Sequence, residues 1–126
     1  MELEKQVSSL ELSKTLKTLG VKQESAFYWD TTETCVYPPN RKPENEWRWS
    51  LGYGWPRNEG ESGRRVISAF TVAELGELLP PYTKSYRYYG GFDCDLENIP
   101  SQRTDTEADA RAAMLIYLIE KGIVKP

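Results

Sequence analysis

The sequence predicts an α+β fold: a mainly antiparallel sheet of about four to five strands with helices packed on it, in the order αββ(β)αββα. Three observations predict it. Apolar residues recur at helical spacing near both ends of the chain and once in the middle. Between these segments, apolar and polar residues alternate with the period of a strand. Turn residues typical of hairpins connect the strand-like segments, and hairpins join antiparallel strands.

Length and composition predict one folded domain that spans residues 1–126, with a polar and disordered segment at 1–7. Charged residues make up 28% and hydrophobic residues 39%, which is typical of a globular chain. The formal net charge of −3 gives no overall attraction to nucleic acid or anionic membranes. The N-terminus lacks the apolar core of a signal peptide, so we expect a cytoplasmic protein with Cys35 and Cys94 reduced.

The last predicted helix is the most distinct element and follows Thr106, whose hydroxyl is a good N-cap. Gly122 is a natural stop in the left-handed conformation. Between them, residues 112–119 form an unbroken apolar run, which needs cover on more than one side. We expect this helix to lie across the sheet face that carries the aromatic residues. A homodimer through 112–119 is one way to cover apolar surface beyond the reach of one small sheet.

Two further helices have N-terminal capping-box spacing. Ser8 and Glu11 open the first, which ends at Gly20. Its apolar stripe consists of Leu12, Leu16 and Leu19. Thr71 and Glu74 open a short middle helix, which ends at the Pro80-Pro81 pair. Its apolar face consists of Val72, Leu75, Leu78 and Leu79.

Strand signals fill the first gap between helices. We predict a hairpin in which residues 25–30 pair with 34–38. The clearest alternation runs over 47–53 and places Trp47, Trp49, Leu51 and Tyr53 on one face. The turn-rich segment 54–63 follows as an exposed loop, and 64–70 is a further short strand.

A second hairpin is predicted between residues 84–89 and 92–96, with Gly90 and Gly91 in the turn. In the second of these strands Phe92, Cys94 and Leu96 point inward, whereas Asp93, Asp95 and Glu97 share the outer face. Residues 98–105 are predicted to be a polar loop.

The absence of histidine excludes several chemistries. It removes the usual general base, so a Ser-His-Asp or Cys-His site cannot form within one chain. Two cysteines without histidine cannot form an ordinary structural zinc site. No segment matches a phosphate loop, and Arg57 replaces the third glycine of a dinucleotide fingerprint that would begin at Gly52. The sequence marks no catalytic residue, so we expect a non-enzymatic protein without a cofactor.

The acidic run at 93–97 resembles the start of a calcium loop, but Asn98 and Thr104 occupy the positions of the essential glycine and glutamate. We interpret this run as a solvated polar face and predict no metal ligands. A weak divalent-cation site is the alternative.

Aromatic and basic residues alternate in several places, and this mixture gives the candidate ligand-binding residues. They are Trp55, Arg57, Tyr86, Arg87 and Tyr88. Rings stack on nucleobases and guanidinium groups pair with phosphate, so these residues could bind a nucleotide or single-stranded nucleic acid. Alternatively, the rings belong to the core and the arginines are their solvent-facing neighbours along each strand.

Two segments together carry a resemblance. They are 70–80, beginning Phe70-Thr71-Val72-Ala73-Glu74-Leu75, and 106–122, beginning Thr106-Glu107-Ala108-Asp109. Leu12-Ser13-Lys14 and Leu19-Gly20-Val21 add to it. The chain resembles a group of small uncharacterised proteins of bacteriophages, prophages and bacterial genomes. The resemblance implies an intracellular, phage-associated context and brings no activity, ligand or site residue.

The function expected from these observations is a non-enzymatic binding or interaction protein of phage or prophage type, with a protein partner or a second copy of itself. The alternative is a small nucleotide- or nucleic-acid-binding protein that uses the aromatic and arginine residues. A histidine-free enzyme ranks last.

Overall fold

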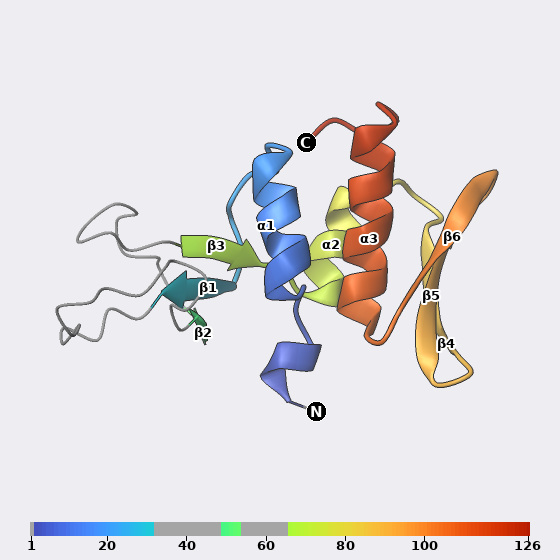
Figure 1. The fold of residues 1–126 in the computed structure, drawn as a ribbon. Helices are drawn as coiled ribbons and strands as arrows, with labels where there is room; N and C mark the ends of the chain where they lie inside the picture. The colour runs from blue at the N-terminus through green and yellow to red at the C-terminus, as the bar shows by residue number, and fades with distance from the viewer. Residues whose placement is uncertain (1, 32–48, 54–65) are drawn as a thin grey trace, which may run out of the picture.

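The computed structural model describes residues 2–31, 49–53 and 66–126. These residues form three α-helices and two small sheets. The helices lie between the sheets, with the first sheet on the left and the second on the right (Figure 1). In chain order the described elements are η1 (Leu3–Lys5), α1 (Leu10–Thr18), β1 (Phe27–Thr31), β2 (Trp49–Tyr53), β3 (Val66–Ala69), α2 (Val72–Leu78), β4 (Lys84–Tyr88), β5 (Gly91–Leu96), β6 (Ile99–Thr104) and α3 (Glu107–Glu120).

The α+β prediction is confirmed, but the described strands form two three-stranded antiparallel sheets instead of one sheet of four to five strands. The strand order is β2-β1-β3 in the first sheet and β4-β5-β6 in the second. The helices lie between the two sheets (Figure 1). The first sheet packs against α1 through β3, and the second sheet packs against α3.

In the first sheet β1 is the central strand. Trp29 lies opposite Leu51 of β2 on one side and opposite Ile67 of β3 on the other. The predicted partner of β1, residues 34–38, lies outside the described residues. The strand predicted at 47–53 is confirmed over 49–53, and the one predicted at 64–70 over 66–69. All four residues of β3 are buried, which explains its position against α1.

In the second sheet the hairpin is confirmed, but its turn is shifted by one residue. Tyr88 pairs with Gly91, so Tyr89 and Gly90 form the turn rather than Gly90 and Gly91. Their φ angles are 46° and 77°, as a type I′ turn requires. Gly91 belongs to β5, and a Cβ there would lie 3.0 Å from the carbonyl oxygen of Thr104. A glycine at this position therefore lets β6 approach.

The predicted loop at 98–105 is incorrect, because residues 99–104 form β6, which pairs antiparallel with β5. Asn98, with a φ of 65°, makes the tight turn between the two strands. The register shifts between Cys94 and Leu96, which leaves Pro100 and Ser101 in an irregular stretch of this edge strand. Proline is tolerated at such a position. A strand that contains Pro, Ser, Gln and Arg lacks the apolar alternation that identifies strands in sequence.

The core lies between α3, the other helices and the inner face of the second sheet. Thr106 caps α3 as predicted, since its side chain accepts a hydrogen bond from the amide of Asp109. The predicted inward direction of Phe92, Cys94 and Leu96 is confirmed, because these residues pack in the core. The helix therefore covers an apolar face of the second sheet and not a face rich in aromatic rings.

The apolar run at 112–119 is covered within one chain. Met114, Leu115 and Leu118 are at most 1% exposed, and the remaining residues of the run are buried or half-buried. The reason for expecting a homodimer through this run was apolar surface left without cover. The second sheet and the two other α-helices around α3 remove that reason.

The N-terminal segment, predicted to be disordered at 1–7, contains the η1 turn and a buried Val7 that bridges to Thr71. The capping box of α2 is confirmed. The cap of α1 is Ser9 instead of Ser8. The Ser8 hydroxyl is used elsewhere, because it bonds the Ser13 hydroxyl (2.8 Å) and accepts from the amide of Phe70 (3.0 Å). Burial of Val7 holds this segment against the start of α2.

Candidate functional site

Exposed tyrosines gather on the outer face of the second sheet, which is turned away from α3. Strand alternation places Tyr86 and Tyr88 of β4 on this face, opposite Asp93 and Gly91 of β5. Their exposed fractions are 42% and 49%, and Tyr89 in the adjoining turn is 86% exposed. These large aromatic side chains lie side by side and expose much apolar surface. Such a patch needs an explanation, because rings exposed to water do not stabilise the fold by burial.

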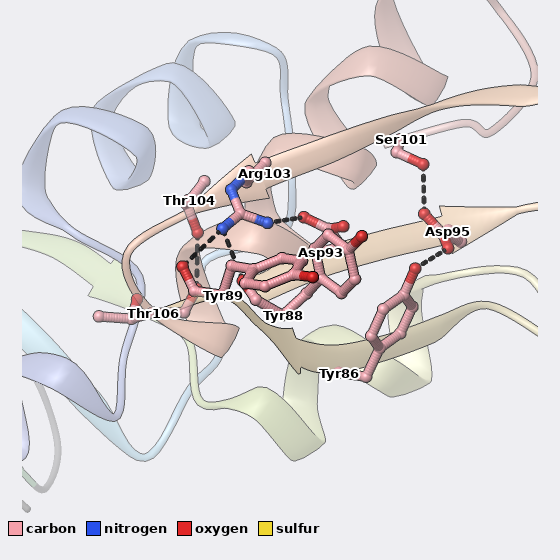
Figure 2. A network of polar contacts seen from close by, with 9 residues as sticks. All are labelled: Tyr86, Tyr88, Tyr89, Asp93, Asp95, Ser101, Arg103, Thr104 and Thr106. Carbon is pink, nitrogen blue, oxygen red and sulfur yellow. Dashed lines mark hydrogen bonds and ion pairs between the residues drawn. The ribbon is translucent and has the colours of Figure 1, made fainter. Parts of the chain in front are cut away.

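Asp95 holds the first of these rings in place (Figure 2). The Tyr86 hydroxyl donates to Oδ2 of Asp95 at 2.6 Å, and the Ser101 hydroxyl donates to Oδ1. The hydrogen bonds from Ser101 and Tyr86 lower the pKa of the Asp95 carboxyl. The bond to Asp95 is the main cause that raises the pKa of Tyr86 to about 12. At neutral pH the pair is thus a carboxylate and a neutral phenol, and the ring direction is fixed.

Arg103 of β6 organises the other two rings (Figure 2). Its Nη1 pairs with Asp93 at 2.9 Å. Its Nη2 donates to the carbonyl oxygens of Tyr88 (2.6 Å) and Tyr89 (3.0 Å), and the guanidinium lies 5.5 Å from the centre of the Tyr88 ring. The rings of Tyr88 and Tyr89 meet edge to face, with their centroids 4.5 Å apart. One side chain therefore fixes both the turn and the rings beside it.

The charges on this outer face are balanced. Lys84 stands directly opposite Asp95, and Arg103 directly opposite Asp93. We call this set the tyrosine face. It consists of Lys84, Tyr86, Tyr88, Tyr89, Asp93, Asp95, Ser101 and Arg103. A face with equal numbers of cations and carboxylates does not attract a polyanion.

The structure brings together only part of the predicted ligand-binding set. Tyr86 and Tyr88 lie on the tyrosine face, whereas Arg87 points to the opposite side of β4, where its guanidinium lies 5.5 Å from the centre of the Phe92 ring. Trp55 and Arg57 lie outside the described residues. The period-two alternation of residues 86–88 was the signal that could have separated the arginine from the tyrosines.

Sequence reasoning missed Tyr89 and Arg103. The sequence pattern predicts Tyr89 in a strand and Arg103 in a loop, so it indicates no contact of either residue with the Tyr88 ring. Asp93 and Asp95 were expected on the outer face and lie there, but their partners depend on cross-strand register. That register follows from the turn at Tyr89 and Gly90, one residue earlier than predicted.

A pocket of about 360 Å³ lies on the other side of β4. Its walls come from η1, the start of β1, the first turn of α2, the β4–β5 hairpin and the start of α3. Lys5, Phe27, Val72, Arg87, Phe92 and Glu107 are among its lining residues. Pockets of this size commonly accept small molecules.

Metal-binding groups do not gather in the described ranges: within 2–31, 49–53 and 66–126, no cluster of three or more His, Cys, Asp or Glu residues could hold a metal ion. Cys94 is a free, fully buried thiol, and burial raises its pKa to about 11. A protonated buried thiol is neither a nucleophile nor a ligand at neutral pH.

Comparison with known proteins gives no relative: no family model, no curated protein and no solved structure matches this chain. In the part of the chain that the structure describes, no helix has the length and apolar character needed to cross a membrane.

Proposed function

We propose that this chain is a non-enzymatic interaction protein that binds a protein partner through the tyrosine face. The observation that carries the proposal is the set of exposed tyrosine rings held in fixed positions by Asp95 and Arg103. Tyrosine and arginine are, with tryptophan, the residues enriched among those that supply most of the binding energy at protein interfaces.

Fixed rings favour binding because their side chains are already immobilised before the partner arrives. A side chain that is free to rotate loses roughly 0.5–1.5 kcal/mol on immobilisation at an interface. Tyr86 is already held by its bond to Asp95, and Tyr88 by contacts with Tyr89 and Arg103. The partner therefore gains ring contacts at a low entropic cost.

The charge balance favours a protein over nucleic acid as the partner. Affinity for nucleic acid comes largely from cations that neutralise phosphates. Here Asp93 already pairs with Arg103, and Asp95 stands opposite Lys84. The nucleotide alternative required arginine and tyrosine on one surface, and β4 places Arg87 on the other side from Tyr86 and Tyr88.

Two further observations support the non-enzymatic and phage-type parts of the proposal. The chain has no histidine, and the carboxylates of the tyrosine face are occupied by hydrogen bonds to Tyr86, Ser101 and Arg103. The resemblance of segments 70–80 and 106–122 to small phage and prophage proteins supports a partner in the cytoplasm of a bacterial host.

The test is affinity capture from host-cell lysate, followed by calorimetry with the purified protein that is captured. The variants are a Tyr88→Ala/Tyr89→Ala double change and Tyr82→Ala as the matched control. Tyr82 is 90% exposed, and it precedes β4 at the end opposite to Tyr89. We expect one protein to bind the wild type and Tyr82→Ala, and the double variant to bind it at least about 30-fold more weakly, as for the loss of roughly 2 kcal/mol.

The proposal is overturned if the double variant binds that protein as tightly as the wild type does. It is also overturned if the wild type binds host RNA at high salt and the Arg87→Gln variant does not. Far-UV circular dichroism of each variant establishes that the fold is intact. Both tyrosines are exposed, so replacing them leaves the core unchanged.

A further inference from the structure

We propose that the pocket behind β4 binds a small aromatic anion: a planar ring that carries a phosphate or carboxylate group. The pocket has a volume of about 360 Å³ and is formed by segments from the start, the middle and the end of the chain. Folding brings the described lining residues together, so this part of the pocket is present before any ligand arrives.

Two cations line this pocket without an anionic partner among the described residues. Arg87 contacts the ring of Phe92 through a cation–π interaction and has no ion pair there. Lys5 of η1 also lines the pocket and has no ion pair with a described residue. A guanidinium held against a ring is oriented in advance and presents its N–H groups to an incoming oxyanion.

The acidic residues at the pocket do not cancel this preference. Glu107 is already engaged, because its Oε2 accepts from the Ser85 hydroxyl at 2.5 Å and lies 3.9 Å from Nη2 of Arg111. Asp105 is exposed at the edge of the pocket. Among the described lining residues, Arg87 and Lys5 therefore face one carboxylate that solvent screens and one that Arg111 already pairs with, and an anion is the preferred ligand.

Part of the remaining lining is apolar and partly aromatic, beside the polar Gln6, Thr71 and Thr106. Phe27 and Phe92 line the pocket together with Val72 and Ala73 of α2. A planar ring can pack on such a wall while its anionic group meets Arg87 and Lys5. Inorganic phosphate alone satisfies only the cations, and an uncharged ring satisfies only the apolar wall.

This site is separate from the tyrosine face, since Arg87 and Tyr88 point to opposite sides of β4. A variant that no longer binds the small ligand should therefore still bind the protein partner. A variant that no longer binds the partner should still bind the small ligand. The two proposals fail independently.

The test is a titration followed by amide NMR shifts and calorimetry. The probes are AMP, phenyl phosphate and phenylacetate, and the controls are benzyl alcohol and inorganic phosphate. We expect at least one aromatic anion to bind with a Kd on the order of 1 mM or tighter, as its size allows. This aromatic anion should shift the amide NMR signals of Arg87, Phe92 and Thr106 and should bind more tightly than either control. A preference for AMP and phenyl phosphate identifies a phosphate ester as the ligand, and a preference for phenylacetate identifies a carboxylate.

Three charge variants and one volume variant decide the assignment. Arg87→Gln and Lys5→Gln should each weaken binding by about ten-fold, since each removes one charge-assisted contact. Lys121→Gln is the matched control, because this exposed cation lies over the Tyr117 ring and does not line the pocket. Ala73→Leu adds volume to the apolar wall without changing charge and should abolish binding. The proposal is overturned if no aromatic anion binds, if benzyl alcohol binds equally well, or if all three charge variants behave alike.

Discussion

Arg103 and Asp93 form an ion pair of 2.9 Å between neighbouring strands of the second sheet, and the same guanidinium binds both carbonyl oxygens at the start of the β4–β5 turn. The Arg103 side chain is 44% exposed and the Asp93 side chain is 15% exposed. A surface ion pair of this kind contributes little to stability by itself. Its importance lies in the turn and the rings that it holds.

The first prediction concerns this arginine. Arg103→Ala removes the two hydrogen bonds to the turn, so we expect a loss of about 1–2 kcal/mol in the free energy of unfolding and faster hydrogen exchange at the amide of Gly91. Arg103→Lys keeps the charge next to Asp93 but cannot form the fork of bonds, so its loss should be smaller. Urea unfolding and hydrogen exchange measure both effects. An unchanged exchange rate in Arg103→Ala would show that the turn holds its shape without this side chain.

A second prediction concerns Gly76 in α2 and Arg111 in α3. A Cβ at Gly76 would collide with Nη1 of Arg111. That guanidinium is held by the carbonyl oxygen of Val72 at 2.9 Å and by the Ser85 hydroxyl at 2.7 Å. In an exposed helix Gly→Ala usually stabilises by about 0.5–1 kcal/mol. Here Gly76→Ala should destabilise by about 1 kcal/mol, because the arginine must move and lose a bond.

A double-mutant cycle checks this reason. In an Arg111→Ala background the collision is absent, so Gly76→Ala should become stabilising by about 0.5–1 kcal/mol. Unfolding in urea of the four proteins gives the coupling energy. The same sign of effect in both backgrounds would contradict the collision and point to a role of Gly76 in the α2 backbone.

The helices were the part of this fold that the sequence predicted best, and the reason is local chemistry. The caps at Thr71 and Thr106 depend on residues only three positions away, and both are present. The alternation of 92–96 also holds, since Phe92 and Cys94 face the core. Signals of this kind need no knowledge of the rest of the chain.

The candidate site was predicted less well, because it depends on contacts between strands. The Tyr86–Asp95 bond and the Arg103–Asp93 pair both require the register of the second sheet. β6 has no apolar alternation to reveal it, and the turn at Tyr89 has a positive φ that a tyrosine rarely adopts. The pocket joins η1 to α3 across almost the whole sequence, and no local pattern indicates such a meeting.

A third prediction concerns the buried thiol. Cys94 is fully buried and burial raises its pKa to about 11, so the reactive thiolate is scarce at pH 8. In a Cys35→Ser background, which leaves Cys94 as the remaining cysteine, we expect no detectable reaction with a disulfide reagent until denaturant is added. The reaction should then follow the unfolding curve. Rapid labelling of the native protein at pH 8 would show that the inner face of β5 opens without global unfolding.

The last prediction concerns Asp109 of α3, which accepts a hydrogen bond of 2.7 Å from the amide of Ser9, the cap of α1. Burial raises the pKa of this carboxyl. The effect of burial is larger than that of the hydrogen bonds from Ser9 and Thr106, which lower the pKa. The folded state therefore holds this proton more tightly than the unfolded state, whose aspartate pKa is about 3.9. The contribution of Asp109 to stability is full below that pH and is lost as the pH rises through the raised folded value.

Asp109→Asn tests this sign, because the amide oxygen still accepts from Ser9 and carries no charge. We expect the variant to be at least as stable as the wild type at pH 7, and the wild type to gain relative to it as the pH falls toward 4. Urea unfolding of both proteins across this range, in constant salt, measures the difference. The positive end of the α3 dipole acts in the opposite direction, since it favours the carboxylate. If the dipole outweighed burial, the variant would be the less stable protein at pH 7, and the wild type would lose stability relative to it on acidification.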